Sequence, residues 1–71
     1  MKITYDAEID ALYIQLRPIN PGEATNQELA EGITADFGPD GLLSGIEILD
    51  ASRICGKERE KVIVELTPIV K

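Results

Sequence analysis

Apolar and polar side chains alternate along short segments of this chain, and this pattern constrains its fold more than any other feature. In residues 11–17, the apolar residues Leu12, Ile14 and Leu16 occupy every second position. Such alternation is typical of antiparallel strands that bury one face. Further strands are predicted in the segments 2–5, 24–29, 33–37 and 42–49. The chain is therefore expected to be mainly β.

We predict one domain, residues 1–71, of the mainly β (α+β) class. Its core element is a single antiparallel β-sheet or meander of about five strands, followed by one short helix after Leu49 and a C-terminal strand. The predicted segments are an N-terminal hairpin at 1–17, strands at 24–49, a helix at 50–56 and the last strand at 62–66.

Residues Gly38, Pro39, Asp40 and Gly41 form the strongest turn signal in the sequence. Proline presets φ, the aspartate side chain can bond the backbone beyond it, and Gly41 can adopt a positive φ without a Cβ clash. These four residues predict a hairpin between the segments on either side.

The apolar pattern sets the expected register of this hairpin. With all four turn residues in the loop, Phe37 faces Leu42 and Ile33 faces Ile46. A bulge at Gly45 would reset this register.

The segment after Leu49 has the end signals of a short helix. Asp50 is the predicted helix cap, and Gly56 is the predicted residue that ends the helix. The last predicted strand, 62–66, has apolar side chains on both faces, so both faces need cover. The sequence leaves open whether this strand pairs within one protomer or between protomers.

The length and the lack of cross-links predict association of several copies. The chain has 71 residues, one Cys and no His. A domain of this size buries a small core, and neither an intramolecular disulfide nor a usual zinc site is available. The predicted core is Ile3, Tyr5, Leu12, Ile14, Leu16, Ile33, Phe37, Leu42, Ile46, Ile48, Leu49, Ile54, Val62 and Val64. Possible interface residues are Tyr13, Ile63 and Leu66.

The charge pattern limits the classes of partner. The net charge is −6, which argues against nucleic-acid binding. Residues 1–50 hold ten acids and two bases, a net of −8, whereas residues 51–71 hold three acids and five bases, a net of +2. This asymmetry suits self-association or a basic protein partner. No apolar run is long enough for a membrane span, and no signal peptide is seen, so the cytoplasm is expected.

No constellation of residues predicts catalysis, a bound metal or a cofactor. Asp6, Glu8 and Asp10 have the spacing that opens an EF-hand loop, but the positions that need glycine and the bidentate glutamate do not match. Asp36 and Glu47 are interpreted as solvated surface acids. We therefore expect a protein that is not an enzyme.

Two stretches resemble a known family. The first is Tyr-Asp-x-Glu-x-Asp-Ala-Leu-Tyr-Ile at residues 5–14. The second begins with Gly-Ile-x-x-Asp-Phe at residues 32–37, passes through Asp40-Gly41, and ends with Gly-Ile-Glu-Ile-Leu-Asp-Ala-Ser at residues 45–52. Together, over roughly residues 1–52, they resemble domain-of-unknown-function family 2283 (DUF2283). The resemblance implies a small prokaryotic cytoplasmic protein with no assigned activity, and it brings no catalytic residues.

Three functional hypotheses follow from the sequence. The leading one is a non-enzymatic, homo-oligomeric protein-interaction module. The first alternative is an antitoxin-like protein that binds a small basic partner through the acidic surface of residues 1–50. The second alternative is a metal or ligand binder that uses carboxylates, namely Asp6, Glu8, Asp10, Asp36 and Glu47.

Overall fold

The computed structural model describes residues 1–58 and 60–66 and confirms a mainly β chain. Its strands are β1 (Lys2–Asp6), β2 (Ala11–Gln15), β3 (Thr25–Ala30), β4 (Ile33–Phe37) and β5 (Leu43–Ile48). They are followed by helix α1 (Ala51–Cys55) and a single 3-10 turn, η1 (Gly56–Glu58). Within the described ranges, no helix is long and apolar enough to cross a membrane.

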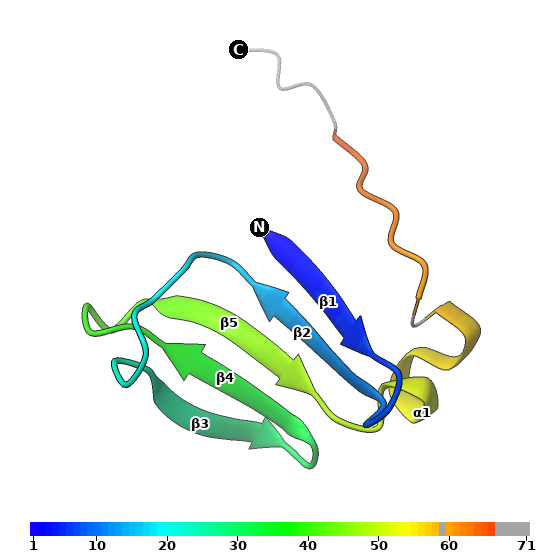
Figure 1. The fold of residues 1–71 in the computed structure, drawn as a ribbon, viewed down its shortest axis with the longest axis horizontal. Helices are drawn as coiled ribbons and strands as arrows, with labels where there is room; N and C mark the ends of the chain where they lie inside the picture. The colour runs from blue at the N-terminus through cyan, green and yellow to red at the C-terminus, as the bar shows by residue number, and fades with distance from the viewer. Residues whose placement is uncertain (59, 67–71) are drawn as a thin grey trace.

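The five strands form one open antiparallel sheet with the order β1-β2-β5-β4-β3. This order departs from a simple meander, because β2 pairs with β5 and not with β3. Residues 16–24 carry the chain around one end of the sheet to the far edge, where β3 begins (Figure 1). The central strand β5 therefore pairs with β2 of the N-terminal hairpin on one side and with β4 on the other.

A β-bulge sets the register between β4 and β5. Ile33 pairs with Ile48 and Phe37 pairs with Leu43, and the shift between these pairs leaves Ser44 as the extra residue on β5. The predicted register is therefore wrong, because it pairs Ile33 with Ile46 and Phe37 with Leu42.

The bulged residue Ser44 is buried, and both its hydroxyl and its backbone oxygen are hydrogen-bonded. Its Oγ donates to the backbone oxygen of Asp36 at 3.0 Å. Its own backbone oxygen accepts from the backbone nitrogens of Leu16 at 2.8 Å and Arg17 at 3.3 Å. The bulge thus extends the pairing of β2 with β5 past the end of β2.

The register gives the sheet two chemically different faces. We call one the apolar face, formed on β1, β2, β4 and β5 by Ile3, Tyr5, Leu12, Ile14, Ile33, Ala35, Phe37, Leu43, Ile46 and Ile48. On β3 the same side of the sheet carries the exposed residues Thr25, Gln27 and Ala30. We call the opposite one the polar face: Lys2, Thr4, Asp6, Ala11, Tyr13, Gln15, Asn26, Glu28, Thr34, Asp36, Gly45 and Glu47.

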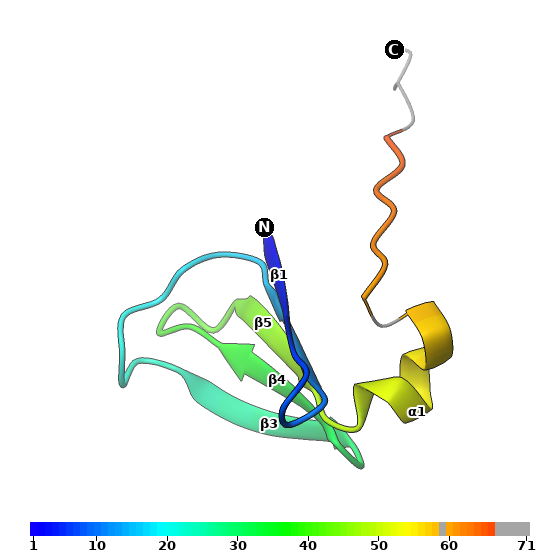
Figure 2. The ribbon, with the colours of Figure 1, turned by 45° about the vertical axis from the view of Figure 1, so that its right-hand side comes forward.

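The sheet forms a single layer, with α1 at one end and not across a face (Figure 2). Among the described residues, the buried apolar ones are Ala11, Leu12, Ala35 and Ala51. The prediction of a larger core is wrong for six residues, which are exposed: Leu16, Leu42, Leu49, Ile54, Val62 and Val64. A single layer has no opposing element that could cover them.

Helix α1 is tied to the N-terminal hairpin by Asp10. Asp50 occupies the N-cap position, but its side chain makes no capping hydrogen bond. The Asp10 carboxylate instead accepts from the backbone nitrogen of Ser52 at 3.1 and 3.2 Å and from the Ser52 Oγ at 2.5 Å. The backbone oxygen of Asp10 accepts from the Ala51 nitrogen at 2.9 Å, and the Tyr5 hydroxyl donates to its carboxylate at 2.7 Å.

The predicted C-terminal strand does not form in this chain. Residues 61–66 have no regular secondary structure, and they run away from the sheet after η1 (Figures 1 and 2). An isolated extended segment gains no inter-strand hydrogen bonds, so apolar alternation alone does not make it a strand.

The Asp10 contact predicts a difference between two otherwise similar substitutions. Asp10→Asn replaces one acceptor oxygen by a donor and is expected to lower the free energy of unfolding by about 0.5–2 kcal/mol, the usual cost of losing a cap. Asp50→Asn is the matched control, because both positions have a positive φ that Asn tolerates. Urea unfolding should show a change within about 0.5 kcal/mol for the control. Equal losses in the two variants would contradict the assignment.

Candidate interaction surface

The apolar face is the most unusual surface of the molecule, because it is only partly covered. Leu12 and Ala35 are buried, whereas the other eight residues of this face are half-buried. Phe37, Ile46 and Ile48 lie on the inner strands β4 and β5, where a second layer would normally pack. This face can therefore bury more apolar area against a partner.

The polar face carries a chain of hydrogen bonds that crosses four strands. The Tyr13 hydroxyl on β2 donates to Asp36 Oδ2 on β4 at 2.8 Å. Asn26 on β3 donates from Nδ2 to Asp36 Oδ1.

Strand β5 lies between β2 and β4, and it presents Gly45 beneath the Tyr13 side chain. A Cβ on Gly45 would lie 2.6 Å from Tyr13 Cζ and 3.1 Å from the Ile14 backbone oxygen. Only glycine therefore leaves room for the tyrosine ring above β5.

The surroundings of Tyr13 favour its neutral form. Partial burial, the hydrogen bond to Asp36 and the negative charges of Asp36 and Glu47 raise the pKa of the Tyr13 hydroxyl to about 12. The hydroxyl therefore remains a hydrogen-bond donor at physiological pH. In this geometry the hydroxyl connects β2 to β4 through its hydrogen bond to Asp36.

An ion pair fastens the turn at residues 38–41. The Arg17 guanidinium donates to Asp40 at 2.7 Å through Nη1 and at 2.5 Å through Nη2, and Nη2 also donates to the Leu42 backbone oxygen at 3.1 Å. The Gly41 nitrogen donates to the Gly38 oxygen at 2.9 Å, and Gly41 has a φ of 82°. The guanidinium beside Asp40 holds the pKa of that carboxyl well below its usual range.

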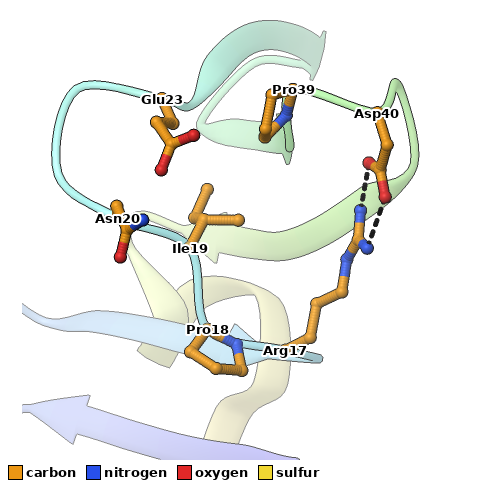
Figure 3. A pocket seen from close by; sticks show the side chains of 7 residues that line it. All are labelled: Arg17, Pro18, Ile19, Asn20, Glu23, Pro39 and Asp40. Atoms are coloured by element: carbon orange, nitrogen blue, oxygen red, sulfur yellow. Dashed lines mark hydrogen bonds and ion pairs between the residues drawn. The ribbon is translucent and has the colours of Figure 1, made fainter.

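A shallow cavity of about 330 Å³ lies between this turn and the loop that follows β2. Figure 3 shows Arg17 reaching Asp40 along one side of it, with Asn20 and Glu23 on the opposite side. The two Nη atoms of the guanidinium are engaged by Asp40 and Leu42, whereas Arg17 Nε is buried without a hydrogen-bond partner among the described residues. The residues that line the cavity hold the loop against the turn.

The interface residues predicted from the sequence lie in different places. Tyr13 belongs to the polar face, where its hydroxyl is bound by Asp36. Ile63 and Leu66 lie in the extended C-terminal segment, with 69% and 88% of their surfaces exposed. Tyr13 is therefore a structural residue of the sheet in this chain, while Ile63 and Leu66 are available for contact.

The carboxylates proposed for a ligand site do not converge. Asp6 accepts from the Glu8 backbone nitrogen at 3.0 Å, which is a local turn contact. Asp10 binds the start of α1, and Asp36 binds side chains on the polar face. In the part of the chain that the structure describes, no group of three acidic or cysteine side chains is placed to hold a metal ion.

Two important contacts were not predicted from the sequence. The sequence placed a bulge at Gly45 as an option, since glycine inside a strand marks a bulge or a close approach. It did not indicate that the approaching group is Tyr13. The contact between Asp10 and Ser52 joins residues 42 positions apart and leaves no local pattern in the sequence.

The family model described as "Protein of unknown function (DUF2283)" matches residues 2–52, which include all five strands and the start of α1. No curated protein and no solved structure matches the chain.

The raised pKa of Tyr13 predicts a pH dependence of stability. A folded-state pKa of about 12 against an unfolded value of about 10 means that folding favours the protonated hydroxyl. The stabilisation is complete below pH 10 and is lost as the pH rises from 10 to 12. Absorbance at 295 nm should show one tyrosine that ionises near pH 12. Tyr13→Phe should remove this step and Tyr5→Phe should retain it; a late step that survives Tyr13→Phe would refute the assignment.

The contact of the Tyr13 ring with Gly45 predicts that substitutions at the two positions have non-additive effects on the free energy of unfolding. Gly45→Ala is expected to destabilise the wild-type chain by about 1–3 kcal/mol, because the new methyl group overlaps the ring. In a Tyr13→Ala background the same change should cost much less, since the ring is gone. Urea unfolding of the four variants measures this coupling. Additive losses would show that the ring does not occupy the space above Gly45.

Proposed function

The chain belongs to the family described as "Protein of unknown function (DUF2283)", and we propose that it works as a non-enzymatic, homo-oligomeric protein-interaction module. The observation that carries this proposal is the apolar face, where eight of ten residues are half-buried in the single chain. A sheet with one apolar face needs an element packed against that face. A second copy of the chain supplies such an element in a symmetric, self-complementary way.

The exposed area of the chain also supports association. The chain exposes 5669 Å², whereas a compact monomer of its mass, 7.8 kDa, exposes about 4,400 Å². The excess is about 1,300 Å², and residues 61–66 contribute part of it. Each partner in a standard protein interface buries about 800 Å². An excess of this size is compatible with a standard interface, and it comes from the extended segment as well as from the sheet.

The polar face favours one further candidate, an antitoxin-like role toward a small basic protein. This face carries Asp6, Glu28, Asp36 and Glu47 against a single base, Lys2. It lies opposite the apolar face, so an oligomer built on the apolar face would leave it free. Electrostatic complementarity to a basic partner would speed association and make it sensitive to salt.

We propose that the protein works in a reducing compartment, the cytoplasm of a prokaryotic cell. Cys55 is unpaired in the chain. Unpaired thiols are usual where glutathione and thioredoxin keep cysteines reduced.

Sedimentation at micromolar concentration tests the homo-oligomer. The wild-type chain should sediment as a dimer or larger species. Ile46→Asp on the apolar face should shift it toward monomer, because the charge would be buried at the interface. Thr34→Asp, on the polar face of the adjacent strand, is the matched control and should leave the assembly intact. Circular dichroism of each variant shows whether the sheet is retained. A stable, folded wild-type monomer would overturn the proposal.

The antitoxin-like candidate is tested by capture from the native host at low salt. A small basic protein should enrich on the wild-type chain and be lost with Asp6→Asn/Glu28→Gln/Glu47→Gln, since these changes neutralise the polar face. Enrichment of no basic protein would refute this second candidate.

A further inference from the structure

The extended segment 61–66 exposes four apolar side chains close together in the sequence. Its four apolar side chains, Val62, Ile63, Val64 and Leu66, are between 54% and 88% exposed. Both views show it leaving the sheet after η1 without lying on any strand (Figures 1 and 2). Three of its six residues are β-branched and it contains no Pro or Gly, a composition that favours a strand.

The sheet has two free edges, and only β1 is suited to accept another strand. Strand β3 is interrupted by a register shift between Glu28 and Ala30, and such bulges keep an edge from pairing with a further strand. Strand β1 pairs with β2 in an unbroken register from Lys2 to Asp6. Its outer edge is therefore straight and regular, and its backbone groups face away from β2.

We infer that residues 61–66 of one copy add to the outer edge of β1 in a second copy as an antiparallel strand. This inference rests on the proposed self-association, and it adds a contact at the sheet edge to the packing of the apolar faces. The pairing is an example of β-strand addition, in which backbone hydrogen bonds supply affinity and alternate side chains set the register.

One antiparallel register matches the apolar side chains Val62 and Val64 with those of β1 and pairs opposite charges. It places Val64 opposite Ile3 and Val62 opposite Tyr5, so the new strand extends the apolar face. The remaining pairs lie on the polar face: Glu65 opposite Lys2, Ile63 opposite Thr4, and Lys61 opposite Asp6. Two pairs of opposite charge therefore flank the strand, and cross-strand pairs of this kind are stabilising.

The charges also disfavour the parallel alternative. A parallel strand that keeps Val62 and Val64 on the apolar face would place Lys61 opposite Lys2 and Glu65 opposite Asp6. Both pairs have like charge and would repel. The order of charges in the two segments thus selects the antiparallel direction.

Charge on a larger scale favours a second copy as the partner. Residues 51–71 have a net charge of +2, whereas residues 1–50 have a net charge of −8. The basic end of one chain is thus attracted to the acidic sheet of another. If both copies donate their segment, the exchange forms a closed two-fold dimer, and it adds a sixth strand to each five-stranded sheet.

A charge exchange tests the register. Lys2→Glu and Glu65→Lys should each raise the dimer dissociation constant, measured by sedimentation, by between about twofold and thirtyfold, because a reciprocal dimer contains this exposed pair twice. The double variant should recover most of the wild-type affinity. Glu60→Lys makes the same charge change outside the paired segment and should not weaken the dimer. Failure of the double variant to recover affinity would overturn this register.

Disulfide trapping tests which copy supplies the strand. In a Cys55→Ser background, Thr4→Cys and Ile63→Cys are placed opposite each other, at a Cα distance that a disulfide can span. Mild oxidation should give a covalent dimer of the double variant. Thr4→Cys combined with Glu65→Cys is displaced by two residues and should give much less. A product linked only within one chain would assign the strand to its own sheet and contradict the exchange.

The same experiment separates this inference from the proposed function. If the protein sediments as an oligomer but no Thr4–Ile63 cross-link forms, the exchange is wrong and the homo-oligomer stands. If the wild-type chain sediments as a folded monomer, both are wrong.

Discussion

A β-sheet with one apolar face is stable only when that face is covered, and this requirement governs the rest of the molecule. In the single chain this face is fully covered at few positions. Among the described residues, three of the four buried apolar side chains are alanines, and the fourth is Leu12. The larger residues of β4 and β5 remain half-buried. Backbone pairing and polar contacts hold this sheet together, and we propose that association supplies the apolar burial that a small domain needs.

The polar contacts are placed where the sheet depends on pairing between distant parts of the chain. Strands β2 and β5 are far apart in sequence, so closing them costs chain entropy. Asp10 fastens one end of this pair to α1, and Ser44 extends its other end. Above the middle, Tyr13 passes over Gly45 and reaches Asp36 on β4. The opposite charges of Arg17 and Asp40 then hold the turn between β4 and β5 against the end of β2.

The sequence predicts the local elements of this fold well, because their signals are local. Alternation at Leu12 and Ile14 marks β2, and the Gly38–Gly41 segment marks the turn into β5. The predicted cap at Asp50 shows the limit of such signals. The right residue type stood at the right position, but Asp10 provides the hydrogen bonds from another part of the chain. The pairing of β2 with β5 and the bulge at Ser44 depend on tertiary contacts in the same way.

The core and the surface were harder to predict for a related reason. Apolar residues such as Leu42 and Val64 were assigned to a core, since apolar side chains are usually inside. In a single layer the same residues are exposed, and the pattern cannot say whether the missing cover lies in the chain or in another copy. The interface assignment of Tyr13, Ile63 and Leu66 stays a prediction: Ile63 and Leu66 are exposed, and the Tyr13 hydroxyl donates to Asp36 within the sheet.

The central claim is that folding and association are coupled, and the concentration dependence of unfolding tests it most directly. When a dimer unfolds to separate chains, mass action raises the stability as the protein concentration rises. The urea midpoint of the wild-type chain should therefore increase steadily between about 1 and 100 μM protein, as a coupled equilibrium requires. A midpoint that stays constant over this range would mean that the open sheet is stable by itself, and it would contradict the account.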